Sequence, residues 1–260
     1  MQLTAKPDFD GAEKSHIVDP LPHERCGPSV VVYVWQYPLR LVHWGLVISI
    51  CLLAFTGYYL HSPFIQGHVR VPFLMGWFRF VHEAVGMAFI AFVLLRFYLF
   101  FGGNHWEGWR QMLPIHASQF REAADTMKFY AFLRPTSIPR VGHNAAAAGS
   151  YIAVYAMALI EIVTGLVMFN LLRHSPVLNP LLGWIPRMMN IQNIRLIHFL
   201  MTFAFFAYGL VHVHLCLINA KIEKNGLMDS IVTGYKVIPI DELNEEDRAA
   251  IAASGASRPR

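Results

Sequence analysis

Four long apolar runs dominate the pattern of hydrophobic and polar positions along the chain. They lie at about residues 41–60, 82–101, 149–172 and 196–219. Because roughly 20 apolar residues in a helix cross the hydrocarbon core of a bilayer, each run predicts a transmembrane helix. The pattern therefore predicts an all-α integral membrane protein, built as a four-transmembrane-helix bundle.

The segments outside the apolar runs divide the rest of the chain. We expect a cytoplasmic N-terminal segment at 1–40, a transmembrane domain at 41–219 and a cytoplasmic C-terminal tail at 220–260. Within the long loop at 102–148, apolar residues recur at helical spacing from Phe120 to Ala131, between charged ones. This spacing predicts an amphipathic helix, either at the membrane interface or as a solvated connector.

Composition and charge agree with a membrane protein and set its expected orientation. The chain is 55% hydrophobic and 15% charged, with a mean hydropathy of +0.40, whereas soluble domains carry about 25% charged residues. Fifteen Lys and Arg residues lie in the two ends and the long loop, and five lie in the short loops between the runs. Because cytoplasmic loops carry the excess of Lys and Arg, both termini and the long middle loop are expected in the cytoplasm. This bias accounts for the pI of about 9.0 and indicates no nucleic-acid partner.

A repeated Arg-x-x-His frame stands at the start of three apolar runs. Residues three apart share one face of a helix, and a histidine in a bilayer is costly and marks a functional site by default. An imidazole there can ligate a haem iron while the arginine pairs with a haem propionate. For the arginines, anchoring at the membrane surface is the alternative. The three frames are Arg40–His43, Arg79–His82 and Arg195–His198.

The fourth run carries further histidines whose spacing indicates how they pair. His198 and His212 are 14 residues apart, which on a helix is a rise of about 21 Å with the two side chains within roughly 40° of each other. His214 lands about 160° from His198, on the opposite face. Depth in the membrane then pairs His82 with His198 near the outer surface and His43 with His212 near the cytoplasmic surface. Two haems held by two imidazoles each are expected, and zinc is the weaker alternative.

Other residues limit the chemistry further. The three cysteines form no Cys-x-x-Cys-His, which argues against covalent c-type haem, and they are too few for a Cys₄ cluster. A haem iron with two imidazole ligands has no open position, so it exchanges electrons and binds no substrate.

Glu161, in the middle of the third run, must be paired or protonated. A hydrogen bond to a neighbouring helix is favoured over a proton path.

The chain resembles the b-type cytochrome subunit of membrane-bound nickel–iron hydrogenases, over roughly residues 30–240. Each short motif is weak alone, but their order along the chain and the histidine spacing together are specific. The segments that carry the resemblance are Pro38–Trp44, Thr56–Tyr58, Arg79–His82, Gly142–Asn144, Thr164–Gly165, His198–His212 and Thr233–Tyr235.

The resemblance implies a four-helix membrane bundle with haem b, docked on the small and large subunits of a periplasmic hydrogenase. It implies that electrons from hydrogen reach a quinone through this subunit, which is then part of an oxidoreductase complex rather than an enzyme by itself. The family's ligand positions fall on His43, His82, His198 and His212. By the same analogy the quinone site lies near the cytoplasmic haem, with His143 and Asn144 as candidates, although Asn144 is equally suited to cap a helix.

Three alternatives stay open at this point. The cytochrome b subunits of formate dehydrogenases share the fourth helix with two histidines, so the electron donor is less determined than the haem chemistry. A standalone b561-type oxidoreductase is the second alternative, and the long loop and N-terminal segment argue mildly against it. A membrane anchor without redox activity is the third, but an anchor has no need of histidines on one helix face.

Overall fold

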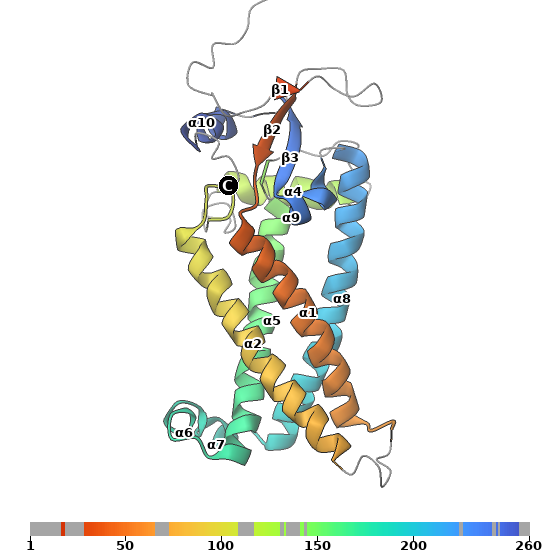
Figure 1. Ribbon diagram of the computed structural model, residues 1–260, viewed down its shortest axis with the longest axis vertical. Coiled ribbons are helices and arrows are strands. Elements are labelled where there is room, and N and C mark those ends of the chain that lie inside the picture. Colours follow the sequence, from red (N-terminus) through yellow and green to blue (C-terminus); the bar gives the residue numbers. More distant parts are fainter. Residues whose placement is uncertain are drawn as a thin grey trace, which may run out of the picture. The chain divides into compact units, whose positions relative to one another are not determined.

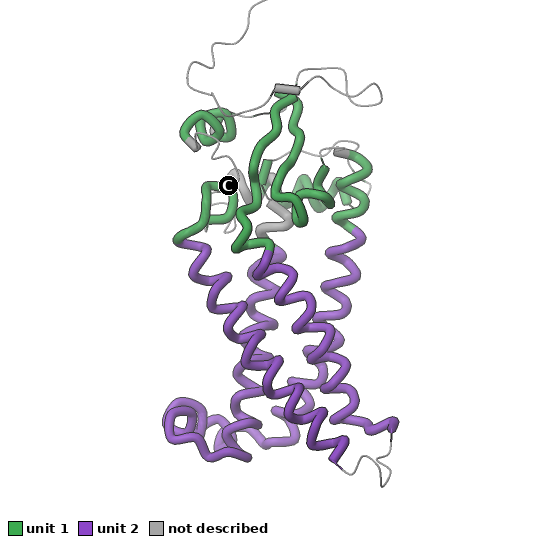
Figure 2. Tube along the Cα trace, in the orientation of Figure 1, with its two compact units in different colours: residues 1–40, 102–149, 215–260 green, residues 41–101, 150–214 purple. Residues whose placement is uncertain are grey.

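The structure is a computed structural model in which the chain forms two compact units (Figure 2). It describes residues 17–18, 29–65, 73–108, 117–130, 133, 141–142, 145–223, 226–240, 243 and 245–254. Unit 1 comprises Met1–Arg40, Gly102–Gly149 and Leu215–Arg260, and unit 2 comprises Leu41–Phe101 and Ser150–His214.

Four long helices run through unit 2 (Figure 1). They are α1 (Tyr37–His61), α2 (Leu74–Gly102), α5 (Ala145–Arg173) and α8 (Ile191–Glu223). All four are long and apolar enough to cross a membrane. A helix suits hydrocarbon because it satisfies each backbone amide within itself. Each of the four predicted runs lies inside one of these helices, so the prediction is confirmed and the chain is a multi-pass membrane protein.

The helices extend beyond the apolar runs that predicted them. Helix α8 begins at Ile191, five residues before the predicted span, and its first turns include the polar residues Gln192, Asn193 and Arg195. Hydropathy marks only the part of a helix suited to hydrocarbon. The backbone hydrogen bonds continue through polar residues until a turn ends them, so the difference is expected.

Large apolar side chains cover the surface of unit 2, and its interior is small. Phe89, Ala158 and Phe205 form the buried centre, with Phe89 and Phe205 edge to face at 6.4 Å. Leu159 and Leu210 are 63% and 74% exposed. Contiguous apolar surface of this kind is unusual on a soluble monomer, and it agrees with an exterior that faces lipid.

Unit 1 contains a small antiparallel sheet that the sequence pattern did not predict. Strand β2 (Ser29–Tyr33) pairs with β1 (Ile17–Val18) on one side and with β3 (Tyr235–Pro239) on the other. Its register pairs Val31 with Val237. Because the strands have five residues or fewer and the pairing joins positions about 200 residues apart, local periodicity gives no signal for it.

Short helices accompany the sheet in unit 1. The helix predicted in the long loop is present as α4 (Ala117–Tyr130), which confirms that prediction. Helices α9 (Leu227–Thr233) and α10 (Glu245–Ser254) lie in the C-terminal segment.

Gly234 joins α9 to β3 and explains the Thr233–Tyr235 motif in structural terms. Its φ of 93° is in the left-handed region, which favours glycine. A Cβ there would lie 2.4 Å from the Tyr33 ring and 2.8 Å from the Trp35 carbonyl oxygen. The Gly234 carbonyl accepts hydrogen bonds from the amides of Val34 and Trp35. The motif therefore holds the C-terminal segment against the residues that precede α1.

Candidate functional site

Four of the histidines in unit 2 form two close pairs. The ring centroids of His82 on α2 and His198 on α8 are 6.2 Å apart, and those of His43 on α1 and His212 on α8 are 6.4 Å apart. The histidines that helix phase and membrane depth paired are therefore the ones whose rings lie together, and their ligation of haem iron stays a prediction. His214, expected on the opposite face of α8, is exposed, as is His212 of the second pair.

The separation within each pair fits a metal ion between two imidazoles. A ring nitrogen binds a transition metal at about 2 Å, and it lies about 1 Å from the centre of its own ring, so two rings on opposite sides of one ion have centroids about 6 Å apart. Both pairs have this spacing. A haem iron takes four nitrogens from its porphyrin and needs two more ligands, whereas a structural zinc ion needs four from the protein. Two histidines per site thus match haem.

Threonine hydroxyls contact both histidines of the His82–His198 pair. The Thr56 Oγ1 atom lies 2.9 Å from Nδ1 of His82, and the Thr164 Oγ1 atom lies 2.9 Å from Nδ1 of His198. Each hydroxyl also donates to the carbonyl oxygen four residues earlier, Leu52 or Ile160, at 2.7 Å. A hydroxyl has a single hydrogen to donate, so each Oγ1 accepts from the Nδ1–H of its histidine. This tautomer leaves Nε2 with a lone pair for iron.

A glycine follows each of these threonines and permits the contact. A Cβ on Gly57 would lie 3.1 Å from the Cε1 atom of His82, and a Cβ on Gly165 would lie 3.2 Å from Cε1 of His198. Such contacts are tighter than ordinary van der Waals contact, so a larger residue would displace the imidazole. The Thr-Gly dipeptide thus positions a histidine on the neighbouring helix. The sequence analysis missed this role, although the repeated dipeptide was a signal for it.

Glu161 also lies beside the His82–His198 pair. Its Oε2 atom is 3.3 Å from the Nδ1 atom of His198. Within the described residues this buried Oε2 atom makes no hydrogen bond, so the hydrogen bond favoured by the sequence is not found there, and the carboxyl group lies within ion-pair distance of a histidine of the pair. Since Thr164 and Glu161 both lie on α5, one helix supplies a hydroxyl acceptor and a nearby carboxyl group to the same imidazole.

The His43–His212 pair has different surroundings. The Tyr208 ring stacks on the His212 ring at 5.9 Å with an angle of 5° between the planes. Within the described residues, the buried Nδ1 atom of His43 has no hydrogen-bond partner. A Cβ added to Gly209, one turn before His212, would meet nothing within 4 Å, so there is open space along this side of α8.

At Gly86, one turn after His82, the nearest atom would be Leu53 Cδ2 at 3.9 Å. Both glycines leave room for a flat group.

The three arginines of the Arg-x-x-His frames differ from one another. Arg40 donates to the carbonyl oxygen of Val232 and to the hydroxyl of Tyr33, at 3.4 Å for the latter. These contacts hold unit 1 together. Arg79 and Arg195 are exposed. Propionate pairing by the three arginines stays a prediction.

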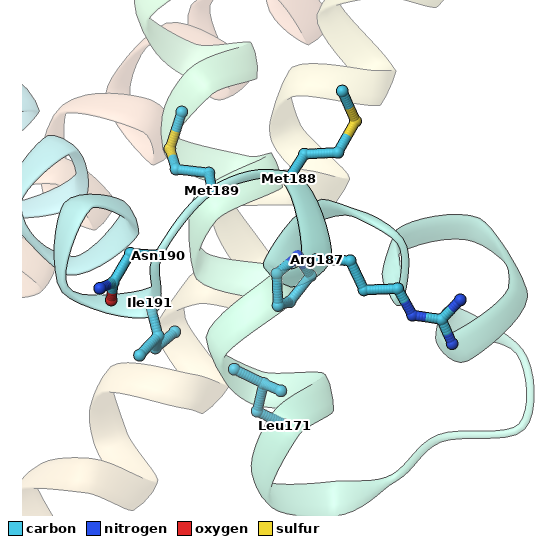
Figure 3. Close-up of a pocket in the computed structure, with 7 residues that line it drawn as sticks. Leu171, Arg187, Met188, Met189, Asn190 and Ile191 are labelled. Carbon is cyan, nitrogen blue, oxygen red and sulfur yellow. The ribbon is translucent and has the colours of Figure 1, made fainter.

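Two further candidates are the predicted quinone-site residues and a groove. His143 and Asn144, the candidates for a quinone site, lie outside the described residues. A groove of about 540 Å³ lies beside the short helix α7 (Ile185–Met188), which with α6 (Leu178–Leu182) connects α5 to α8. Figure 3 shows Met188 and Met189 projecting to the same side of the chain there. The groove is lined by Leu171, Pro186, Arg187, Met188, Met189, Asn190 and Ile191, and none of the four paired histidines lines it.

The fold and the histidine pairs together define a class: a membrane protein of four long helices with imidazole pairs suited to haem iron. The family described as prokaryotic cytochrome b561 matches residues 34–234, and the chain belongs to that family. Haem b is the cofactor of a b-type cytochrome.

Curated relatives carry a more particular name. The chain is 29% identical over 224 residues to a probable Ni/Fe-hydrogenase B-type cytochrome subunit of Azotobacter vinelandii, covering 84% of this chain and 93% of that protein. A protein of the same name from Bradyrhizobium diazoefficiens is 28% identical over 247 residues, covering 91% and 98%. A probable Ni/Fe-hydrogenase 1 B-type cytochrome subunit of Escherichia coli strain K12 is 24% identical over 226 residues, covering 84% and 95%. The resemblance predicted from the motifs is confirmed.

Proposed function

We propose that this chain is the dihaem membrane subunit that takes electrons from a periplasmic nickel–iron hydrogenase to the quinone pool and anchors the complex. The observation that carries the proposal is the presence of two histidine pairs on one four-helix unit, each with the spacing of a metal-linked pair. The names of the relatives support the hydrogenase as electron donor.

The two pairs stand at different depths along the helices. His198 and His212 are 14 residues apart on α8, which is a rise of about 21 Å. We call the His82–His198 pair the outer site and the His43–His212 pair the inner site. When bound, each haem b supplies a one-electron carrier. Electrons enter at the outer site and leave at the inner site.

The residues around the two sites support electron transfer and not the making or breaking of covalent bonds in a substrate. With two histidines to hold each haem iron, neither site would offer a place for substrate. Thr56 and Thr164 keep the outer imidazoles in the tautomer that binds iron. In the overall reaction, hydrogen gives two electrons and two protons in the hydrogenase, and a quinone takes two electrons and two protons at the cytoplasmic side. The chain by itself is thus an electron-transfer subunit.

The proposed orientation follows the charge bias of the sequence. Both termini and the 102–148 loop are cytoplasmic, and the membrane is the bacterial inner membrane. The quinone then binds near the inner site, where His143 and Asn144 are the candidate hydrogen-bonding residues. Arg40, Arg79 and Arg195 pair with propionates.

The first experiment quantifies haem in the purified complex by pyridine haemochrome and compares four histidine variants. We expect two haems b per chain. His82→Ala and His198→Ala should each remove the outer haem, while His43→Ala and His212→Ala should each remove the inner one. His214→Ala is the matched control on α8 and should retain both. A folded chain without haem would overturn the proposal, and a single haem would overturn its dihaem form.

The second experiment tests the donor and the acceptor. Membranes that contain the complex should reduce an added quinone with hydrogen, and the four histidine variants should lose this activity while hydrogenase activity with a soluble dye remains. Reduction by formate and not by hydrogen would replace the hydrogenase by a formate dehydrogenase. Quinone reduction without a co-purifying hydrogenase would indicate a standalone b561-type oxidoreductase.

A further inference from the structure

Arg96 is the only Lys or Arg residue within the four predicted spans. It lies on α2 and is 5% exposed, among the apolar side chains of unit 2. A charged side chain is costly in a membrane and marks a functional site by default. The guanidinium also keeps its proton in proteins, so burial does not neutralise it. The role of this cation needs a physical explanation.

The position of Arg96 on α2 repeats the position of His212 on α8. Arg96 follows His82 by 14 residues, and His212 follows His198 by the same 14 residues. On a helix this spacing returns to within roughly 40° of the starting direction after a rise of about 21 Å. The rings of His82 and His198 lie together, so the two helices are level at the outer site. The same 14-residue rise along each helix then places Arg96 at the depth of His212, on the face of α2 that carries His82.

Contacts within unit 2 support this placement. The guanidinium carbon of Arg96 lies 4.7 Å from the centre of the Phe100 ring, a cation–π contact. The Phe100 ring is 5.4 Å from the Tyr155 ring. Tyr155 is within electrostatic range of both Arg96 and Tyr208. Tyr208 stacks on His212, so the groups within electrostatic range of Tyr155 include both Arg96 and a neighbour of an inner ligand.

We propose that Arg96 raises the reduction potential of the inner haem relative to the outer haem, which makes inward electron transfer favourable. The inference rests on the proposed dihaem function. A haem iron that accepts one electron loses one unit of positive charge, and a fixed cation nearby favours that reduced form. The effect is larger in the low dielectric of a membrane interior than in water. At the outer site the Thr164 hydroxyl lies 2.9 Å from Nδ1 of His198 and the Glu161 carboxyl oxygen lies 3.3 Å from the same atom, and such neighbours raise the basicity of a ligand and favour the oxidised form.

The test is a spectroelectrochemical titration of the two haems in the whole hydrogenase complex carrying Arg96→Gln. We expect the reduction equilibrium of the inner haem to weaken at least tenfold, which is 59 mV for one electron, while the outer haem is unchanged. Arg96→Lys should restore most of the loss because it keeps the charge. Arg187→Gln removes an exposed arginine on α7 and should shift neither potential. The inner haem is identified by its absence from the His212→Ala complex.

Each outcome decides the proposal. Retention of both haems in Arg96→Gln with an unchanged inner potential would overturn it. An equal shift of both potentials would also overturn it. Loss of the inner haem would overturn it as well, because Arg96 would then be needed to hold that haem in place. If the Arg96→Gln complex does not assemble, the two reduction potentials are compared in the unmodified complex. There the proposal requires the inner haem to have the higher potential, and an equal or lower one would overturn it. A chain with fewer than two haems refutes the proposed function instead, and pyridine haemochrome separates that case.

Discussion

The hydrogen bond between Thr56 and His82 allows a quantitative test of the outer site. Thr56→Val keeps the shape of the side chain and removes the Oγ1 atom that lies 2.9 Å from Nδ1 of His82. Outer-shell partners of a metal-binding histidine typically contribute 10–100-fold in affinity. An interhelical hydrogen bond in a membrane contributes about 0.6 kcal/mol, with a maximum of about 1.7. We therefore expect about tenfold weaker retention of the outer haem, and a normal inner haem.

The structure also predicts that the two threonines are not equivalent. His198 has Glu161 Oε2 at 3.3 Å in addition to Thr164, so Thr164→Val leaves a carboxyl oxygen within ion-pair distance of the same Nδ1 atom. In the described part of the chain, Thr56 is the side chain that His82 hydrogen-bonds. Thr56→Val should therefore weaken haem retention more than Thr164→Val. Adding Glu161→Gln to Thr164→Val tests whether the carboxylate compensates.

The assay is haem loss from purified protein to an excess of an apo haem acceptor, followed by absorbance. Thr56→Ser keeps the hydroxyl and should release haem at the rate of the unmodified protein. Equal release rates for Thr56→Val, Thr56→Ser and the unmodified chain would refute the reasoning, because the hydroxyl would then contribute nothing to the ligand. Faster release by Thr56→Ser as well would assign the effect to packing.

Two further changes test the glycines that the fold requires. Gly165→Ala places a Cβ 3.2 Å from Cε1 of His198 and should shift the outer-haem absorption or electron paramagnetic resonance signal while sparing the inner one; an unchanged spectrum would contradict the close contact. Gly234→Ala combines a φ of 93° with a Cβ 2.8 Å from the Trp35 carbonyl oxygen, so it should destabilise the protein by about 1–3 kcal/mol, measured as a lower Tm in detergent. Gly149, where a Cβ would meet nothing within 4 Å, is the matched control for both.

The sequence by itself determined the membrane helices and the histidine pairs. Runs of about 20 apolar residues can satisfy their backbone only as helices in hydrocarbon, so hydropathy alone predicted all four. The 14-residue spacing from His198 to His212 then set their faces and depths, because a helix has a constant rise and turn. Because α8 supplies one histidine to each pair, depth in the membrane then identified His82 as the partner of His198 and His43 as the partner of His212.

Only the tertiary structure decided which residues surround those pairs. The Thr56–His82 and Thr164–His198 contacts join different helices, so their geometry depends on helix rotation and packing, which no local pattern encodes. The same is true of the β2–β3 pairing, which joins the two ends of the chain. Arg96 had the spacing of a site residue in the sequence, but its burial and its aromatic neighbours on α2 and α5 became visible only in the packed helices.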